Sequence, residues 1–107
     1  MIGECFLDDY DENDYGRVLT LEATIYRSLN SKYYGSGMTV DKCKKICFEN
    51  NNFKFAGVET ELKIESQCFC DNVVSHTTPA SDCNTECSGD NSQICGGPYR
   101  INVYQKK

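Results

Sequence analysis

The fold of this chain is decided by residues 38–47, which read MTVDKCKKIC. Thr39 is a good N-cap, and Asp41 stands in the first turn, where its negative charge suits the helix dipole. Apolar residues and cysteines recur at helical spacing, and the lysines between them fall on the opposite face. The stretch therefore predicts a helix that begins at Val40 and ends at about Asn50.

A second stretch reads Gln-Cys-Phe-Cys and predicts a strand over residues 67–70. The helix carries Cys43 and Cys47 on one face, about 6 Å apart along its axis. The strand carries Cys68 and Cys70 on one face, about 6.7 Å apart. Because the two intervals match, both pairs can be bridged together at ordinary Cα separations and would staple the helix to the sheet. Spacing alone leaves two pairings for these four residues.

The chain has 8 cysteines in 107 residues, which indicates a disulfide framework. They are Cys5, Cys43, Cys47, Cys68, Cys70, Cys83, Cys87 and Cys95. No zinc-type CxxC pair occurs and His76 is the only histidine, so we expect oxidised sulfur rather than a structural metal, and no cofactor. Disulfides at this density need an oxidising compartment, which predicts a secreted protein or the ectodomain of a surface protein.

Length and charge limit the possible partners. A chain of 107 residues is expected to form one domain, and its modest aliphatic content leaves part of the stability to cross-links. The net charge of -5 and the sequence pI of about 4.7 argue against a nucleic-acid surface and against docking on anionic lipids, since both need clustered Lys and Arg. A neutral partner or a basic one fits better.

Targeting signals are missing from the sequence itself. No basic n-region or apolar h-region follows Met1, and no stretch approaches the length of a membrane span. Because the cysteines need an oxidising compartment, we expect that a signal peptide precedes this segment in the natural protein and that Met1 is an added start residue. No Asn-x-Ser/Thr acceptor is present, so N-glycosylation is not expected.

Three further strands and several loops complete the expected order of elements. Residues 2–7 have the length of a short strand, residues 53–58 alternate as another, and residues 101–104 form a third. Turns are expected at residues 59–66 and 96–98.

The acidic stretch over residues 8–16 is a loop that partly matches a calcium-binding template. Asp9, Asp11 and Asn13 fall on the first three ligand positions of an EF-hand loop. The template fails at two positions, because Asp14 stands where glycine is required and Thr20 where the closing glutamate is required. A solvated acidic loop is the better interpretation.

Four stretches together are similar to the WSC domain. They are MTVDKCxxxC at 38–47, FAGVE at 55–59, QCFCDN at 67–72, and DCNxxCSGDNSQICGGPYRINVY at 82–104. The resemblance covers essentially the whole chain, so residues 1–107 are expected to be a single WSC domain. WSC domains occur in fungal cell-wall stress sensors, in fungal lectins and carbohydrate-active enzymes as an appended module, and in animal surface proteins such as the Kremen receptors.

The resemblance implies an α+β, small disulfide-rich PAN/apple-like fold, with one helix packed on a small antiparallel sheet. It also implies the disulfides Cys5–Cys83, Cys43–Cys68, Cys47–Cys70 and Cys87–Cys95, of which the middle two agree with the staple. Two features depart from the family pattern. The interval between Cys5 and Cys43 is long, and Asp71 stands where glycine usually follows CxC, so it needs a permissive or shifted turn.

The function that the resemblance implies is recognition of a glycan, such as β-glucan in a cell wall. A pyranose needs an exposed aromatic ring flanked by planar polar groups that bond its hydroxyls. Tyr33 and Tyr34, in a glycine-flanked loop, are one candidate, with packing over the core as the alternative. A second candidate comprises Tyr99 and Arg100 beside Asp90, Asn91 and Gln93, where the polar side chains could instead brace the turn. Tyr10 and Tyr15 are a weaker third.

Catalysis is poorly supported by the sequence. His76 lacks a thiolate partner when all cysteines are paired, and a glycosidase carboxylate pair would need an apolar cleft that a domain of this size can hardly build. We therefore expect a binding module rather than an enzyme, although such a module can be appended to one. The alternative function is a protein-interaction or mechanosensing module of a surface receptor or sensor.

Overall fold

The structure is a computed structural model, and it describes residues 3–8, 18–19, 21–22, 37–60 and 66–107. The elements in chain order are β1 (Glu4–Leu7), β2 (Leu21–Glu22), α2 (Val40–Lys44), the π-helical η2 (Lys45–Asn50), β3 (Phe55–Glu59), β4 (Gln67–Asp71), β5 (Glu86–Cys87), β6 (Asp90–Ile94) and β7 (Arg100–Gln105).

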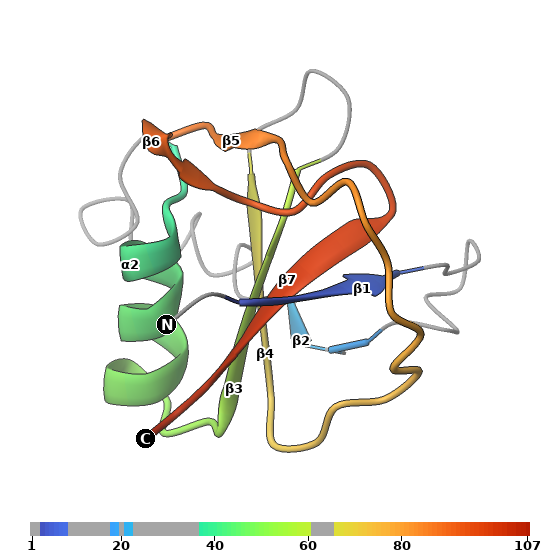
Figure 1. The fold of residues 1–107 in the computed structure, drawn as a ribbon. Coiled ribbons are helices and arrows are strands. Elements are labelled where there is room, and N and C mark those ends of the chain that lie inside the picture. The colour runs from blue at the N-terminus through green and yellow to red at the C-terminus, as the bar shows by residue number, and fades with distance from the viewer. Residues whose placement is uncertain (1–2, 9–17, 20, 23–36, 61–65) are drawn as a thin grey trace.

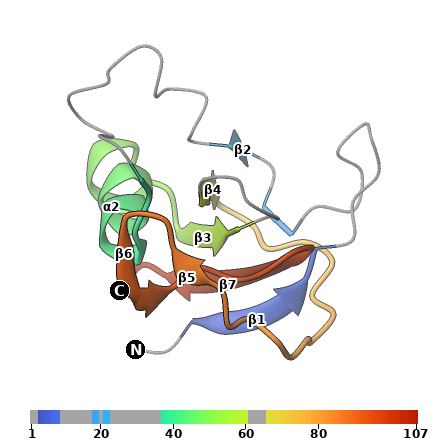
Figure 2. The same ribbon diagram turned by 90° about the horizontal axis from the view of Figure 1, so that it is seen from above.

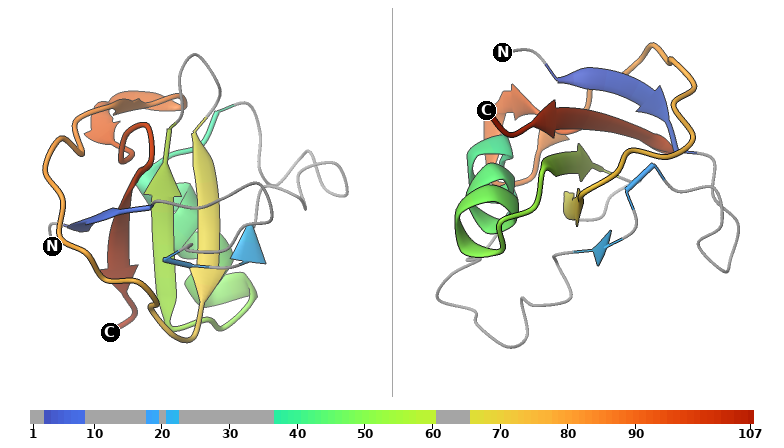
Figure 3. Two further views of the ribbon diagram at one scale, coloured as in Figure 1. Left: turned by 90° about the vertical axis from the view of Figure 1, so that its right-hand side faces the viewer. Right: turned by 90° about the horizontal axis from the view of Figure 1, so that it is seen from below.

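The described strands form an antiparallel five-stranded sheet in the order β1-β7-β3-β4-β2 and a separate hairpin of β5 and β6. The continuous helix of α2 and η2 packs across one face of the sheet, against β3 and β4 (Figures 1 and 2). The left view of Figure 3 shows the sheet from the face that the helix does not cover. The α+β, disulfide-rich fold expected from the sequence is thus confirmed.

The helix spans the predicted residues, and polar groups satisfy both of its ends. Thr39 is the N-cap, and its hydroxyl accepts a hydrogen bond from the backbone N–H of Lys42 at 3.0 Å. At the other end the Asn51 amide donates to the carbonyl of Ile46 at 2.7 Å, and the Phe53 N–H donates to the carbonyl of Cys47 at 2.7 Å. These bonds satisfy carbonyls that a helix terminus leaves without intrahelical partners. The change to π-helical geometry from Lys45 onward was not predicted.

All four expected disulfides are present. The two staples, Cys43–Cys68 and Cys47–Cys70, each have a Cα–Cα distance of 5.4 Å, so the matched intervals on helix and strand are bridged side by side. The other two bonds join Cys5 to Cys83 and Cys87 to Cys95. No free cysteine remains, and the spacing argument for oxidised sulfur is confirmed.

Strand alternation divides the core into two layers. Between sheet and helix lie the sulfurs of the staples together with side chains such as Val58 and Tyr104. On the opposite face lie Phe6, Phe69 and Ile101, packed with Val18 and others. Each strand therefore sends alternate residues to different layers, as the two-residue period of a strand requires.

The hairpin of β5 and β6 docks on the start of the helix. Gly37 has a φ of 83°, and a Cβ on it would lie 2.7 Å from the Cα of Gly89, so the two backbones meet where no side chain fits. The Gly89 N–H donates to the carbonyl of Met38 at 2.9 Å. The hydroxyl of Ser88 accepts from the N–H groups of Met38 and Ser66, at 3.1 and 3.0 Å. The segment before the helix is thereby fixed to the hairpin.

Asp71 needs no unusual backbone, because it is the last residue of β4. Its carboxylate accepts from the N–H groups of Asn72 at 2.7 Å and Val73 at 3.3 Å. The side chain thus closes the turn that follows the strand.

Candidate functional site

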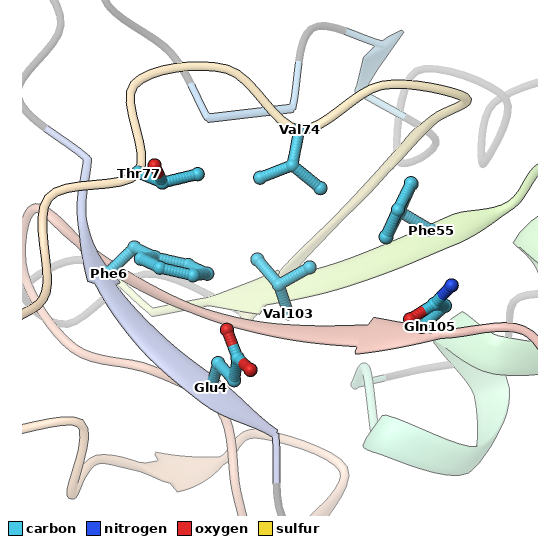
Figure 4. A pocket seen from close by; sticks show the side chains of 7 residues that line it. All are labelled: Glu4, Phe6, Phe55, Val74, Thr77, Val103 and Gln105. Atoms are coloured by element: carbon cyan, nitrogen blue, oxygen red, sulfur yellow. The ribbon is translucent and has the colours of Figure 1, made fainter.

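A groove with a volume of about 300 Å³ lies on the face of the sheet opposite the helix (Figure 4). We call it the outer groove, and its lining residues are Glu4, Phe6, Phe55, Val74, Thr77, Val103 and Gln105. Sequence analysis did not predict this site.

Three neighbouring strands build the floor of the outer groove. Glu4 pairs with Val103 across β1 and β7, and Phe55 pairs with Gln105 across β3 and β7. Residues two apart on one strand share a face, so Phe6 joins Glu4 on the groove side of β1. The pairing of β1 with β7, from opposite ends of the chain, is what creates the site.

The segment after β4 forms the opposite wall and brings in Val74 and Thr77 (Figure 4). It runs alongside β1, where the Leu7 N–H donates to the carbonyl of Thr78 at 2.9 Å and the Ala80 N–H donates to the carbonyl of Cys5 at 3.1 Å. The backbone of this wall is therefore held in place by hydrogen bonds close to Thr77.

The chemistry of the outer groove suits an amphipathic ligand. Phe6 and Val103 are almost fully buried in the floor, at 9% and 7% exposure, and Phe55 is half-buried at one end. Glu4, Thr77 and Gln105 are exposed and offer a carboxylate, a hydroxyl and an amide. An apolar floor with a few polar groups around it is typical of small-ligand sites.

Tyr99 is the sequence-predicted aromatic residue that the structure places at the surface. Its side chain is 49% exposed, and its φ of 56° lies in the left-handed region that favours glycine. Its carbonyl accepts from the Asp8 N–H at 2.8 Å. The ring is therefore presented from a turn that backbone contacts hold.

Arg100 braces that turn. Its Nε donates to the carbonyl of Ser81 at 2.8 Å, and its Nη1 donates to the carbonyl of Pro98 at 3.1 Å. These bonds occupy two of the guanidinium nitrogens. The bracing role that sequence analysis considered as the alternative is thus the geometry observed.

The three polar residues of β6 have different surroundings. Gln93 binds the start of the helix, where its Oε1 accepts from the Val40 N–H and its Nε2 donates to Asp41 Oδ2, both at 2.9 Å. The carboxylate of Asp90 accepts a hydrogen bond from the hydroxyl of Ser92 and another from its backbone N–H, and these two bonds lower the pKa of Asp90. Asn91 is exposed.

The second predicted candidate site is therefore divided in space. Figures 1 and 2 place β6 beside α2 and the beginning of β7 on the other side of the molecule. Gln93 contacts the helix and Arg100 contacts the segment around Ser81, so the structure does not bring these two side chains together. Tyr33, Tyr34, Tyr10 and Tyr15 lie outside the described residues, as does the calcium-like stretch from Asp9 to Asn13.

Among the described residues, no group of side chains is arranged as a catalytic or a metal-binding site. His76 is exposed on the wall segment, with a φ of 56°. The sulfur atoms of Cys43, Cys47 and Cys68 lie within 4.8 Å of one another, but each belongs to a disulfide and is not a thiolate ligand. Among the described helices, none has the length and hydropathy of a membrane-spanning segment.

Comparison with known proteins identifies the family. A family model of the WSC domain matches residues 17–97. The chain belongs to the WSC family. Four disulfides and this membership fit an oxidising, extracellular compartment.

Three relatives illustrate the range of proteins that contain similar sequence. A WSC domain-containing protein of Arthroderma benhamiae is 38% identical over 74 residues, which is 66% of this chain and 8% of that protein. Xylosyltransferase oxt of Drosophila melanogaster is 34% identical over 85 residues, 74% of this chain and 9% of that protein. Kremen protein 1 of Mus musculus is 38% identical over 71 residues, 63% of this chain and 14% of that protein. The chain thus matches a small part of each.

Proposed function

We propose that this domain is an extracellular, non-catalytic carbohydrate-binding module and that the outer groove holds one sugar of a polysaccharide such as β-glucan. The outer groove carries the proposal. A pyranose has apolar C–H faces and a rim of hydroxyls, so it matches a floor of Phe6, Phe55 and Val103 with polar side chains at the edge.

The polar groups at the edge complement hydroxyls in both directions. The Glu4 carboxylate accepts hydrogen bonds, while the Thr77 hydroxyl and the Gln105 amide can each donate and accept. All three side chains are exposed, so they exchange bonds to water for bonds to sugar without leaving buried groups unsatisfied. Membership of the WSC family supports the same function.

The test is retention of the purified domain on insoluble β-glucan. Single substitutions Glu4→Ala, Thr77→Ala and Gln105→Ala should each weaken retention, and Phe55→Leu should weaken it about 5-fold or more by removing an aromatic face worth about 1–3 kcal/mol. Asn84→Ala is the matched control, because it also removes one exposed polar side chain but does not line the outer groove. The melting temperature should stay within a few degrees for the three edge variants.

Alanine variants at Tyr33, Tyr34 and Tyr99 test the site predicted from sequence. Loss of retention in these variants, with full retention in the groove variants, would move the binding site to those tyrosines and reject the outer groove. If the unaltered domain is not retained on any polysaccharide, the carbohydrate function itself is rejected, and a protein-interaction or mechanosensing module is the function to test next.

A further inference from the structure

The described lysines are gathered in one region of an acidic protein. They are Lys42, Lys44, Lys45, Lys54, Lys106 and Lys107, on the helix and at the adjoining ends of β3 and β7. The backbone N–H of Lys106 donates to the carbonyl of Lys54 at 2.8 Å, which joins the ends of the two strands. The net charge of -5 therefore conceals a local basic surface.

Part of this basic surface forms a hollow of about 290 Å³, lined by Lys44, Phe48, Gln105 and Lys107. We call it the lysine hollow. The Lys44 ammonium lies 4.5 Å from the centre of the Tyr104 ring, an attraction that holds the charge in place before any ligand arrives. A held ammonium loses less conformational entropy on binding an anion than a freely rotating one.

Gln105 lines both the lysine hollow and the outer groove, so the two sites adjoin at the end of β7. Figure 4 shows Gln105 at the end of the groove nearest the helix, with Glu4 on the neighbouring strand β1. A ligand lying along the groove thus meets a carboxylate from β1 and ammonium groups beyond Gln105. This polarity favours a ligand with its negative charge at the lysine end.

We propose that the ligand is an acidic polysaccharide, with one sugar in the outer groove and the carboxylate of a neighbouring sugar between Lys44 and Lys107. This inference rests on the proposed carbohydrate function and adds the charge of the ligand. At physiological salt the screening length is about 8 Å, so charges close to the hollow set the local sign, and Lys42, Lys44 and Lys45 outnumber Asp41 and Glu49 on the same helix. A carboxylated polymer is favoured over a densely sulfated one, because the two ammonium groups of the lysine hollow match a single carboxylate, and the Glu4 carboxylate in the outer groove disfavours further negative charge on the neighbouring sugar.

The experiment compares three forms of one β-glucan backbone: unmodified, carboxymethylated and sulfated. The domain should bind the carboxymethylated form about 2- to 20-fold more tightly than the unmodified form in low salt, from two partly exposed ion pairs. The preference should shrink as salt rises. The double variant Lys44→Gln with Lys107→Gln should lower the affinity for the carboxymethylated form to that measured for the unmodified form.

Lys45→Gln is the matched control, since it removes the same charge from the same helix but does not line the lysine hollow, and it should keep most of the preference. If Lys44→Gln disturbs folding through loss of the Tyr104 contact, Lys107→Gln alone should still lower the preference to about its square root, because one of the two ion pairs remains.

Each adverse result has a distinct meaning. Equal binding of the unmodified and carboxymethylated forms overturns the acidic ligand and leaves the proposed carbohydrate function standing. Tighter binding of the sulfated form than of the carboxymethylated form overturns the choice of carboxylate. If the double lysine variant still prefers the carboxymethylated form, the lysine hollow is not the cause of that preference. Failure to bind any of the three polymers removes this inference and the proposed function together.

Discussion

Replacing Gln93 with leucine should destabilise the domain and leave polysaccharide binding intact. The amide of Gln93 makes two hydrogen bonds to the first turn of the helix, one with the Val40 N–H and one with the Asp41 carboxylate, both 2.9 Å long. The helix is short and begins at Val40, so this side chain satisfies one of the few N–H groups at its start that lack intrahelical partners.

The expected loss follows from these two bonds. A partly buried neutral hydrogen bond contributes about 1 kcal/mol, and the exposed bond to Asp41 adds about 0.5–1 kcal/mol because water weakens it. The free energy of unfolding should therefore fall by about 1.5–2 kcal/mol, which for a chain of this length lowers Tm by about 5–10 °C. Gln93→Glu should lose a similar amount, because its carboxylate would face Asp41.

The assay is urea unfolding without reductant, paired with retention on β-glucan for each variant. Asn91→Ala, on the same strand and exposed, is the control and should unfold like the unaltered domain. An unchanged unfolding midpoint for Gln93→Leu combined with lost retention would refute the reasoning and restore Gln93 as a sugar ligand.

Three other outcomes are expected. Removing Cys5 and Cys83 together should lower the free energy of unfolding by about 2 kcal/mol more than removing Cys87 and Cys95. The two sequence separations are 78 and 8, and the longer closed loop restrains the unfolded chain more. Equal losses in urea unfolding would mean that the rigidity of the hairpin matters more than chain entropy. Reductant should unfold the domain, while EDTA alone should leave its circular dichroism unchanged. Burial raises the pKa of Tyr104 above 10.0, so the contribution of the neutral phenol to stability is complete below pH 10 and is lost as pH rises through the higher pKa of the folded state. The variant Tyr104→Phe should therefore lose less stability above pH 10 than the unaltered domain. An identical dependence of stability on pH would contradict this.

The helix and its staples could be predicted because their information is local. An N-cap, a helical period and matched cysteine intervals all lie within short stretches, and the structure confirms each of them. The strand predicted over residues 53–58 begins later, at Phe55, since the Phe53 N–H closes the helix end instead of pairing in the sheet. Periodicity does not reveal that competition.

The hairpin and the outer groove could not be predicted from local sequence patterns. Residues 90–94 read Asp-Asn-Ser-Gln-Ile, which has low strand propensity, and the disulfide between Cys87 and Cys95 supplies the constraint that side chains do not. The groove depends on β1 lying beside β7, a pairing between the two ends of the chain that neither strand encodes alone. The two-residue period of a strand already places Glu4 and Phe6 on one face of β1, and Val103 and Gln105 on one face of β7. What the sequence does not reveal is which strand lies next to which in the sheet.

A pulling force on the two ends of this domain would act first on β1 and β7, the first and last strands of the chain. These neighbours are antiparallel, so their hydrogen bonds would open one after another rather than together. At Cys5 the load would cross the sulfur bridge to Cys83 and bypass all the residues between them. Pulling would therefore extend the segment that follows Cys83, and the Cys87–Cys95 bond limits how far this segment can extend. It would separate β7 from the outer groove, while the two disulfides keep the helix attached to β4.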